Sequence, residues 1–282
     1  MIWSLAALDG LAIPMAVAAL GLVAVGFAVG VLSAAFGIGG GFVITPLCHA
    51  VLGMPAPLAV ATSMGQIPLL SLSGVWRYWQ SRNIVWPLAS YLLLGAIPAA
   101  QVVAYLLTQR PSAAWPEVIA GQSVPDLILL TAFTLCIGGL GLYNLMAARS
   151  TQQRWGGPKR IGPLALVLSG LVFGGLSAML GIGGGFFAVP LFTYFCGLSP
   201  VQAVATSLFA VFVTSALTTV HYLWLGQIYF GLSLIIAIGS IVGARVGASL
   251  AIRSSPGGLL KALGLAQVVI SMAYLGMKLM GN

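Results

Sequence analysis

Charged residues are scarce in this chain of 282 residues, of which eleven are Lys or Arg and three are Asp or Glu. They make up 5% of the sequence, whereas soluble domains carry about 25% charged residues. Hydrophobic residues make up 60%, and the mean hydropathy is +1.09. This composition excludes an ordinary soluble domain and favours a chain that lies within a lipid bilayer.

Carboxylates are the scarcest charged groups, and Asp9, Glu117 and Asp126 all lie outside the middle of an apolar run. Ion pumps relay protons or hold cations through intramembrane carboxylates, so this shortage argues against such a mechanism. Catalysis by paired carboxylates, by a Ser-His-Asp set or by a metal cluster also lacks its residues. We therefore expect no cofactor, and the chain is not predicted to be an enzyme.

Cysteine is also scarce, and basic residues are missing from the start of the chain. Cys48, Cys136 and Cys196 lie within apolar segments, where cysteine behaves as a small hydrophobic residue rather than as part of a disulfide or metal framework. No Lys or Arg precedes Arg77, so the basic region of a cleavable signal peptide is missing. The first apolar span is therefore expected to remain in the mature protein.

Long apolar runs fill most of the remaining sequence. About 20 apolar residues form a membrane-spanning helix, and uninterrupted runs differ from the alternating segments of a β-barrel. Asp126 is expected to cap the fourth run. The sequence predicts an all-α polytopic membrane protein with long spans over residues 11–35, 58–76, 84–107, 127–147, 163–180, 201–223, 228–251 and 259–279.

One stretch occurs twice. Residues 32–47 read LSAAFGIGGGFVITPL and residues 176–191 read LSAMLGIGGGFFAVPL, with nine of the first twelve positions identical. The same shift of 144 residues pairs Thr62-Ser63 with Thr206-Ser207 and Tyr78 with Tyr222. We infer a duplication into a first repeat, 1–147, a basic cytoplasmic linker, 148–162, and a second repeat, 163–282. Each repeat has four long spans and one short glycine-broken segment, 36–53 or 180–197.

The short segments decide how the repeats are oriented. If they cross the membrane fully, each half has five crossings and the halves are inverted; if they do not, each half has four and the halves run parallel. Cytoplasmic loops are enriched in Lys and Arg. With the linker inside, the inverted arrangement places eight basic residues inside and two outside, against seven and three for the parallel one. The count favours inverted repeats, with Arg77, Arg82, Arg149, Arg154, Lys159, Arg160, Arg253 and Lys261 inside and Arg110 and Lys278 outside.

The glycines of the repeated motif are the main candidates for a binding site. In hydrocarbon, a broken helix survives only where it is buried in protein or lines a cavity. The freed N–H groups and the helix N-terminus after the break suit an anion, and paired broken helices mark transporter sites. The alternative is that the glycines only permit tight helix packing. The candidate residues are Gly37, Gly39, Gly40, Gly41, Gly181, Gly183, Gly184 and Gly185.

Polar side chains near the breaks extend this candidate site. Thr62, Ser63, Thr206 and Ser207 could bind an oxyanion, or could bond a carbonyl one turn back in their own helix. Gln66 lies one turn beyond Ser63 and is a further donor.

Three further ionisable residues lie in or near the spans, and each has a functional and a structural interpretation. Arg245 lies inside a span and is either an anion ligand or a side chain that snorkels to the interface. His221 is a candidate titrating group or an interfacial anchor. His49, whose counterpart is Thr193, is predicted to be structural.

The doubled GIGGGFxxxPL motif, each copy followed by Ala-Thr-Ser, resembles the TauE/SafE sulfite exporter family, also called the 4-toluenesulfonate uptake permease family. The resemblance covers residues 15–279. It implies a permease of the bacterial or archaeal inner membrane with seven to nine helices. It also implies a sulfur-containing anion as substrate, such as sulfite, thiosulfate or an organosulfonate, with the motif glycines and the two Thr-Ser pairs as site residues.

The primary hypothesis from the sequence is a secondary permease with a central site at the two glycine breaks. A passive anion channel on the same scaffold and a membrane-embedded enzyme are the alternatives. The expected partners are a small sulfur-containing anion and membrane lipid. Nucleic acid is not expected, because most of the basic residues lie between spans. The direction of transport, the coupling ion and the oligomeric state stay open.

Overall fold

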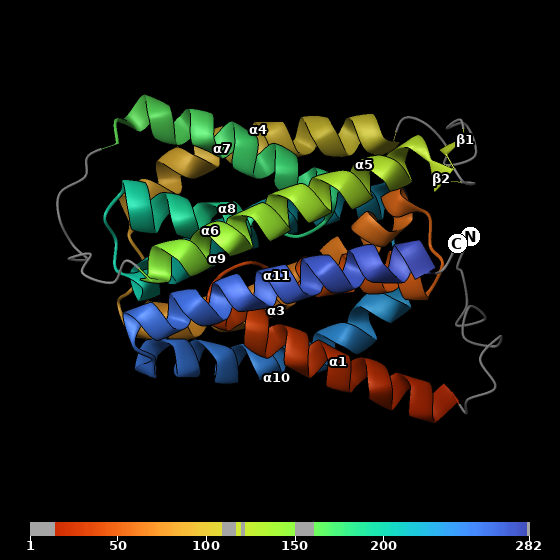
Figure 1. The fold of residues 1–282 in the computed structure, drawn as a ribbon, viewed down its shortest axis with the longest axis horizontal. Coiled ribbons are helices and arrows are strands. Elements are labelled where there is room, and N and C mark those ends of the chain that lie inside the picture. The colour runs from red at the N-terminus through yellow and green to blue at the C-terminus, as the bar shows by residue number, and fades with distance from the viewer. Residues whose placement is uncertain (1–14, 109–116, 120–121, 150–160, 281–282) are drawn as a thin grey trace.

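The computed structural model describes residues 15–108, 117–119, 122–149 and 161–280. Most of the predicted linker, residues 150–160, lies outside this part of the chain, as do Arg110 and the first residues of the predicted span 11–35. The described residues form an all-helical bundle with one short β-hairpin (Figure 1).

Eight helices of the described chain are long and apolar enough to cross a membrane, as the hydropathy predicted. One of them is interrupted by a π-helical turn, η4, and is counted as α5–η4–α6. The spans are α1 (Met15–Phe36), α3 (Ala56–Gln80), α4 (Trp86–Thr108), α5 (Val124–Phe133) with η4 (Thr134–Gly138) and α6 (Gly139–Arg149), α7 (Pro163–Leu180), α9 (Pro200–Trp224), α10 (Phe230–Arg253) and α11 (Pro256–Met280).

Two short helical segments follow the glycine breaks. The first is α2 (Gly41–Pro46) with η2 (Leu47–Val51), and the second is α8 (Gly185–Pro190) with η5 (Leu191–Phe195). Each becomes π-helical directly after a proline, Pro46 or Pro190, because proline has no N–H to continue the α-helical ladder. A small hairpin of β1 (Glu117–Ile119) and β2 (Gln122–Ser123) precedes α5.

The short segments are re-entrant. In Figure 1, α1 begins at the right-hand end of the bundle, and α3, which follows η2, also begins there. In the second half, α7 and α9 both begin at the left-hand end. A broken helix and its short segment thus return the chain to the end where it entered. The first half then finishes at the left with α6, and the second finishes at the right with α11.

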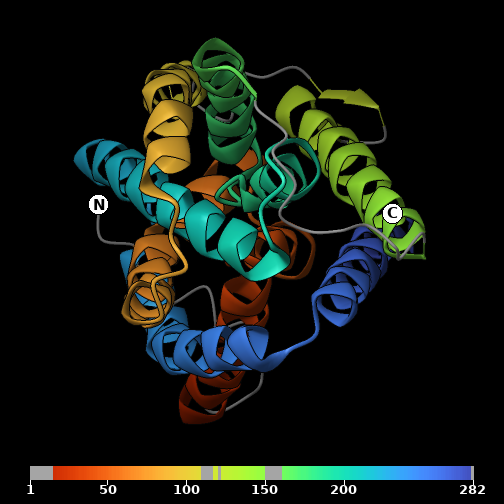
Figure 2. The same cartoon turned by 90° about the vertical axis from the view of Figure 1, so that its left-hand side faces the viewer.

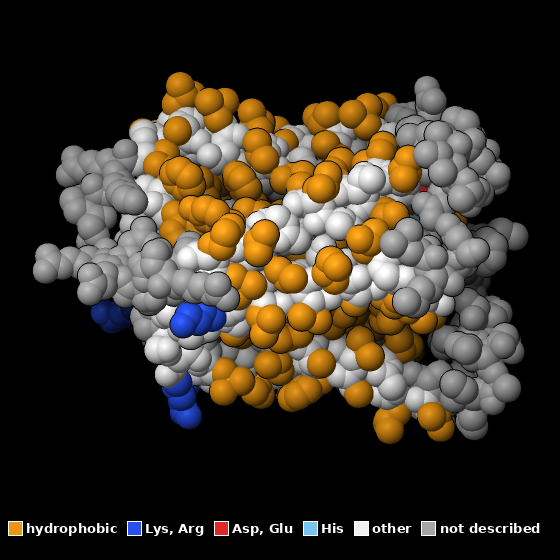
Figure 3. All heavy atoms as spheres, viewed as in Figure 1, with side chains coloured by type: hydrophobic (Ala, Val, Ile, Leu, Met, Phe, Trp, Pro, Cys, Tyr) orange, Lys and Arg blue, Asp and Glu red, His pale blue; other side chains and the backbone are white. Residues whose placement is uncertain are grey.

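The surface of the bundle suits a bilayer. Figure 3 shows hydrophobic side chains spread along the sides, and the Lys and Arg side chains visible on this face lie at its left-hand end. That end also holds the α3–α4 and α10–α11 connections (Figure 1). Arg77 and Arg82 at the end of α3 and Arg253 at the end of α10 belong to it, which is the grouping that the inverted arrangement predicts. The orientation of this end in a cell stays a prediction.

Small residues allow helices of opposite halves to pack closely. Gly26 and Gly30 of α1 lie against the carbonyls of Ile236 and Ser240 on α10, where a Cβ would collide. The same contacts recur 144 residues on, where Gly170 and Gly174 of α7 lie against Leu92 and Ala96 of α4. These are GxxxG contacts, which bring membrane helices together at backbone distance. Each half therefore packs mainly against the other.

A separate layer is formed by α5–η4–α6 and α11, which lie side by side in Figures 1 and 2. Polar contacts join them: the Asn144 side-chain amide donates to Gln267 Oε1 over 2.9 Å, and the Ser271 hydroxyl donates to the Thr134 carbonyl over 3.2 Å. Tyr194 on η5 donates to Asn144 Oδ1 over 3.3 Å and connects this layer to the second short segment.

Candidate functional site

The two glycine breaks meet in the middle of the bundle. The Gly185 N–H donates to the Ile38 carbonyl over 3.1 Å, which joins the second break to the first. A Cβ added to Gly39 would lie 3.3 Å from Gly183 Cα. Gly39 and Gly183 have φ values of 90° and 93°, which residues with a side chain rarely adopt. The predicted breaks are therefore real turns, and they form one centre rather than two.

Close approach explains the last glycine of each motif. A Cβ on Gly41 would collide with the Gly181 carbonyl, and a Cβ on Gly185 would collide with the Gly37 carbonyl. Each short helix therefore starts directly against the backbone of the opposite half. The N–H groups of Gly39, Gly40, Gly41, Gly183 and Gly184 donate none of the hydrogen bonds described outside the helices. The centre is therefore held by close backbone contact between the two breaks.

The two motif serines bond to the opposite break. The Ser207 hydroxyl donates to the Gly37 carbonyl over 2.8 Å. Ser63 Oγ lies 2.9 Å from the Gly181 carbonyl oxygen and accepts a hydrogen bond from the Thr45 hydroxyl over 2.7 Å. Both serines are fully buried. The Ser63 hydroxyl also lies 2.8 Å from the Val60 carbonyl of its own helix, and the Thr206 hydroxyl donates to the Gln202 carbonyl one turn back over 2.7 Å, so the alternative of a bond within the helix also applies.

The two motif threonines anchor the starts of later helices. Thr62 Oγ1 accepts a hydrogen bond from the Tyr229 N–H over 3.3 Å, just before α10. Thr206 Oγ1 accepts one from the Val85 N–H over 3.1 Å, just before α4. Val85 and Tyr229 are themselves 144 residues apart. Like the serines, the threonines connect one half of the chain to the other.

Gln66 is a polar side chain at the centre that makes no described hydrogen bond. It is fully buried on α3, and neither its amide nitrogen nor its amide oxygen has a hydrogen-bond partner among the described residues. A Cβ on Gly40 would lie 2.6 Å from Gln66 Nε2, so the amide lies directly beside the first break. The equivalent position in the second half is Ala210. The centre is therefore asymmetric at this position, with an amide in the first half and a methyl group in the second.

His221 and Arg245 lie away from this centre. His221 is in the last turn of α9, fourteen residues after Ser207, which corresponds to about 21 Å along a helix. Arg245 is exposed on α10, in the half of that helix that runs to the charged end. The structure brings the predicted glycines, hydroxyls and Gln66 together, but it does not bring these two residues to them.

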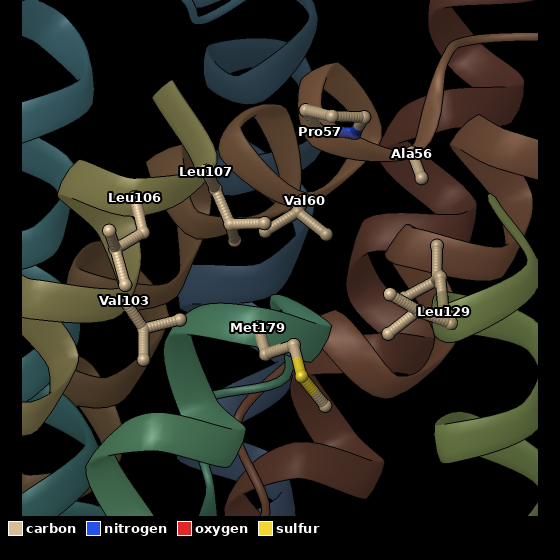
Figure 4. Close-up of a pocket in the computed structure, with 9 residues that line it drawn as sticks. Ala56, Pro57, Val60, Val103, Leu106, Leu107, Leu129 and Met179 are labelled. Carbon is tan, nitrogen blue, oxygen red and sulfur yellow. The ribbon is translucent and has the colours of Figure 1, made fainter. Parts of the chain in front are cut away.

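An apolar pocket of about 210 Å³ approaches the second break. It lies between α3, α4, α5 and α7, and Val60 and Met179 face it from α3 and α7 (Figure 4). The Val60 Cα lies 2.9 Å from the position that a Cβ on Gly181 would take. No charged side chain lines the pocket, so it offers apolar walls and no ligand for an anion. Its lining is Ala56, Pro57, Val60, Val103, Leu106, Leu107, Ile128, Leu129 and Met179.

Several polar residues were not singled out in the sequence. Pro68 cannot donate to the carbonyl of Met64, four residues earlier, and the Thr219 hydroxyl of α9 donates to that oxygen over 2.9 Å. In the sequence, Pro68 was the feature that could have indicated this hydrogen bond. Thr45, Asn144 and Gln267 gave none, because single polar residues in apolar runs have no pattern. Among the described residues, no three His, Cys, Asp or Glu side chains gather as metal ligands.

Asp126 and His49 form the other polar cluster. Asp126 was expected to cap its own helix, but Oδ1 accepts a hydrogen bond from the Ala56 N–H at the start of α3, over 2.9 Å. The same oxygen lies 3.7 Å from His49 Nδ1 on η2. His49 is 4% exposed, whereas the Asp126 side chain is 17% exposed, so the histidine is the buried member of the pair.

Comparisons with known proteins agree with this architecture. The family model described as sulfite exporter TauE/SafE matches residues 22–275. The probable membrane transporter protein YjnA of Bacillus subtilis is 27% identical over 83% of this chain and 91% of its own length. The probable membrane transporter protein MJ0441 of Methanocaldococcus jannaschii is 26% identical over 83% and 87%.

A plant relative matches over a shorter stretch. Sulfite exporter TauE/SafE family protein 1 of Arabidopsis thaliana is 28% identical over half of this chain and 32% of its own length. No solved structure matches. With its eight apolar helices and a family match over nearly its whole length, the chain is an integral membrane transporter that belongs to the TauE/SafE sulfite exporter family.

Proposed function

We propose that the protein is a secondary permease for a small sulfur-containing anion, such as sulfite, thiosulfate or an organosulfonate, and that the anion binds where the two glycine breaks meet. The observation that carries this proposal is the buried Gln66 amide, which lies beside Gly40 without a hydrogen-bond partner among the described residues. A buried polar group in that state costs about 1–3 kcal/mol. A ligand that accepts its hydrogen bond would remove this cost during transport.

The surroundings of Gln66 suit an anion. The Gln66 amide nitrogen is a hydrogen-bond donor beside the first break, and among the described residues no carboxylate is buried at the centre. The sulfur assignment rests on the family description and not on the geometry. Other small oxyanions have the same hydrogen-bonding chemistry, so the substrate panel below includes them.

Access to the centre requires movement. The central glycines and the two motif serines are fully buried, so the conformation described here is closed around the proposed site. Each serine holds the carbonyl of the opposite break. We infer that the bonds of Ser63 and Ser207 open and re-form as one half rocks against the other. Such rocking of repeats around a fixed site is the usual form of alternating access.

The first test uses purified protein and a panel of sulfite, thiosulfate, sulfoacetate, taurine, sulfate, acetate and chloride. Thermal stabilisation by each anion measures binding, because a ligand of the folded state raises apparent stability. Flux into proteoliposomes then measures transport. Selective binding and saturable flux of a sulfur anion support the proposal. Equal binding of every anion would remove the sulfur assignment, and conductance far above carrier turnover would favour the channel.

The sharpest variant is Gln66→Leu, which keeps the side-chain volume and removes the polar atoms. We expect its melting temperature without ligand to rise, because a buried unsatisfied amide is lost. Anion affinity should fall about tenfold to a hundredfold, since a hydrogen bond to a charged group contributes about 1.5–3 kcal/mol. Gly21→Ala is the control, because nothing lies within 4 Å of the added Cβ. Unchanged affinity in Gln66→Leu would contradict the site assignment.

A further inference from the structure

The pair formed by His49 and Asp126 joins three parts of the bundle. His49 lies on η2, the end of the first re-entrant segment, and Asp126 lies in the first turn of α5. Asp126 Oδ1 accepts the Ala56 N–H at the start of α3 over 2.9 Å and lies 3.7 Å from His49 Nδ1. Of the Asp and Glu side chains, Asp126 is the only one that the structure describes. The carboxylate thus contacts the first short segment and the start of α3 from its place at the start of α5.

The hydrogen bond of the imidazole fixes its neutral form. His49 Nδ1 lies 2.8 Å from the Met54 carbonyl oxygen. A carbonyl can only accept, so Nδ1 carries the hydrogen of this bond and Nε2 is the atom that takes up an added proton. The resulting imidazolium would face the Asp126 carboxylate at the short distance of the pair. The carboxylate would then be the counter-charge of the imidazolium.

Among the described side chains around the pair, we assign the proton exchange to His49 and Asp126 alone. The Tyr274 ring of α11 meets the His49 ring edge-on with centroids 6.2 Å apart, and its buried hydroxyl has no described hydrogen-bond partner. Phe133 packs on the other side of Tyr274 with centroids 5.0 Å apart. Cys48, beside His49, packs in the cluster of Leu22 and Val29. The side chains of Asp9, Arg110, Glu117 and Lys278 lie outside the described residues.

The second half has no equivalent of this pair. The shift of 144 residues places Thr193 opposite His49 and Ile270 opposite Asp126. The Thr193 hydroxyl is buried and has no described hydrogen-bond partner. Only the first re-entrant segment therefore ends in a group that changes charge, and the fold provides one such site per chain.

A direct mechanical path connects the pair to the central glycines. His49 is eight residues after Gly41 in an unbroken helical segment, about 12 Å along its axis. Charging His49 would strengthen the contact of this segment with α5, whereas neutralising it would weaken that contact. A shift of the segment moves Gly39–Gly41, because a helix transmits displacement along its length.

We propose that the His49–Asp126 pair binds the proton that couples anion transport to the proton gradient, with one proton for each anion. This inference rests on the proposed function. Proton uptake on the imidazole forms the ion pair, fixes η2 against α5 and stabilises one of the two conformations of the first break. Release of the proton returns the ring to its neutral form, bonded to Met54. The coupled ion is therefore H⁺, although the chain holds hardly any carboxylates.

The test measures anion flux and proton movement together in proteoliposomes, the second with an internal pH dye, over pH 5–8. In the wild-type protein we expect proton movement with the anion and a flux that changes at least about fivefold across this range, at the lower end of coupled transitions. His49→Gln and His49→Thr should keep anion binding at the centre and lose both the proton movement and the pH dependence. The threonine is the residue found at position 193.

Asp126→Asn separates charge from hydrogen bonding, because the amide oxygen can still accept from Ala56. We expect the flux midpoint to move to lower pH, since the imidazolium loses its partner. His221→Gln is the competing variant, because His221 is the other histidine of the chain. Anion flux without proton movement in the wild type, or proton movement retained in His49→Gln, would overturn the inference and leave the proposed function intact.

A measurement without substrate tests the proton site in the case that no anion is transported. If no anion of the panel moves, the proposed function fails, and melting temperatures over pH 5–8 then decide on the proton site. Different pH dependence in the wild type and in His49→Gln would keep the pair as a proton-binding site. Identical dependence would remove it as well.

Discussion

At the scale of single residues, glycine in this protein serves approach as much as bending. Gly41 has no positive φ, yet a side chain there would meet the backbone of Gly181 in the other half. The three successive glycines therefore combine two requirements, a turn at Gly39 and a backbone contact at Gly41.

Replacing Gly41 with Ala should therefore destabilise the protein strongly, because the obstacle is a carbonyl and not a flexible side chain. We expect a loss of about 1–3 kcal/mol, the usual cost of forcing an extra carbon into a packed core, measured by thermal unfolding in detergent. Gly21→Ala is again the matched control, with open space around the added Cβ. Equal melting temperatures for both variants would show that the breaks do not pack as described.

The roles of individual polar residues could be predicted only in part. The sequence placed Ser63, Ser207, Thr62 and Thr206 beside the breaks, and Ser63 and Thr206 do approach carbonyls one turn back. The serines also meet carbonyls that are 118 and 170 residues away. Nothing in a local pattern indicates such a partner. His49 was read as structural for the same reason, since Asp126 is 77 residues distant. Residue types and their local positions follow from the sequence, whereas pairing across the halves depends on the packed fold.

At the scale of helices, a proline leaves a backbone carbonyl without its helical donor, and a neighbouring helix supplies one. Pro68 leaves the Met64 carbonyl of α3 without its helical donor, and Thr219 of α9 supplies one. The hydrogen bond joins the two helices that contact both glycine breaks. The sequence predicted both spans and their approximate bounds, 58–76 and 201–223, because continuous hydropathy needs no tertiary information. It did not predict this crosslink.

A double-mutant cycle tests the crosslink. Thr219→Val alone leaves the Met64 carbonyl unsatisfied and should cost about 0.6–1.7 kcal/mol, the range for hydrogen bonds between membrane helices. Pro68→Ala restores an N–H in α3 that can bond the same carbonyl. In this background Thr219→Val should cost less, and the difference is the coupling energy. Additive costs would show that Thr219 acts through packing. Thr218→Val, which loses a bond within α9, is the control.

At the scale of the whole molecule, the re-entrant segments account for how each half starts at one end of the bundle and finishes at the other. Each half has four long apolar helices, but the first of them forms a hairpin with its short segment and returns the chain to the end where it entered (Figure 1). The remaining three passages are enough to move the chain from one end of the bundle to the other. Charge counting favoured the same grouping of basic residues, although it could not detect the hairpins.

Impermeant thiol labelling in whole cells tests the resulting topology. In a background without Cys48, Cys136 and Cys196, we expect Ser81→Cys and Ser254→Cys to share one accessibility, because both are exposed at the charged end. Leu225→Cys, exposed where α9 ends, should show the opposite accessibility. Ser81 and Ser254 on opposite sides would support parallel repeats and contradict the inverted arrangement.

The exchange of partners between the halves has a consequence for biosynthesis. The GxxxG face of α1 packs on α10, and about 200 residues separate the two helices in the chain. At about 5–20 residues per second, the ribosome needs roughly 10–40 s to deliver that partner. During this time the first helix lies in the bilayer with its glycine face against lipid, open to any other small-residue helix nearby. During assembly, α10 therefore competes with other helices in the membrane for the glycine face of α1.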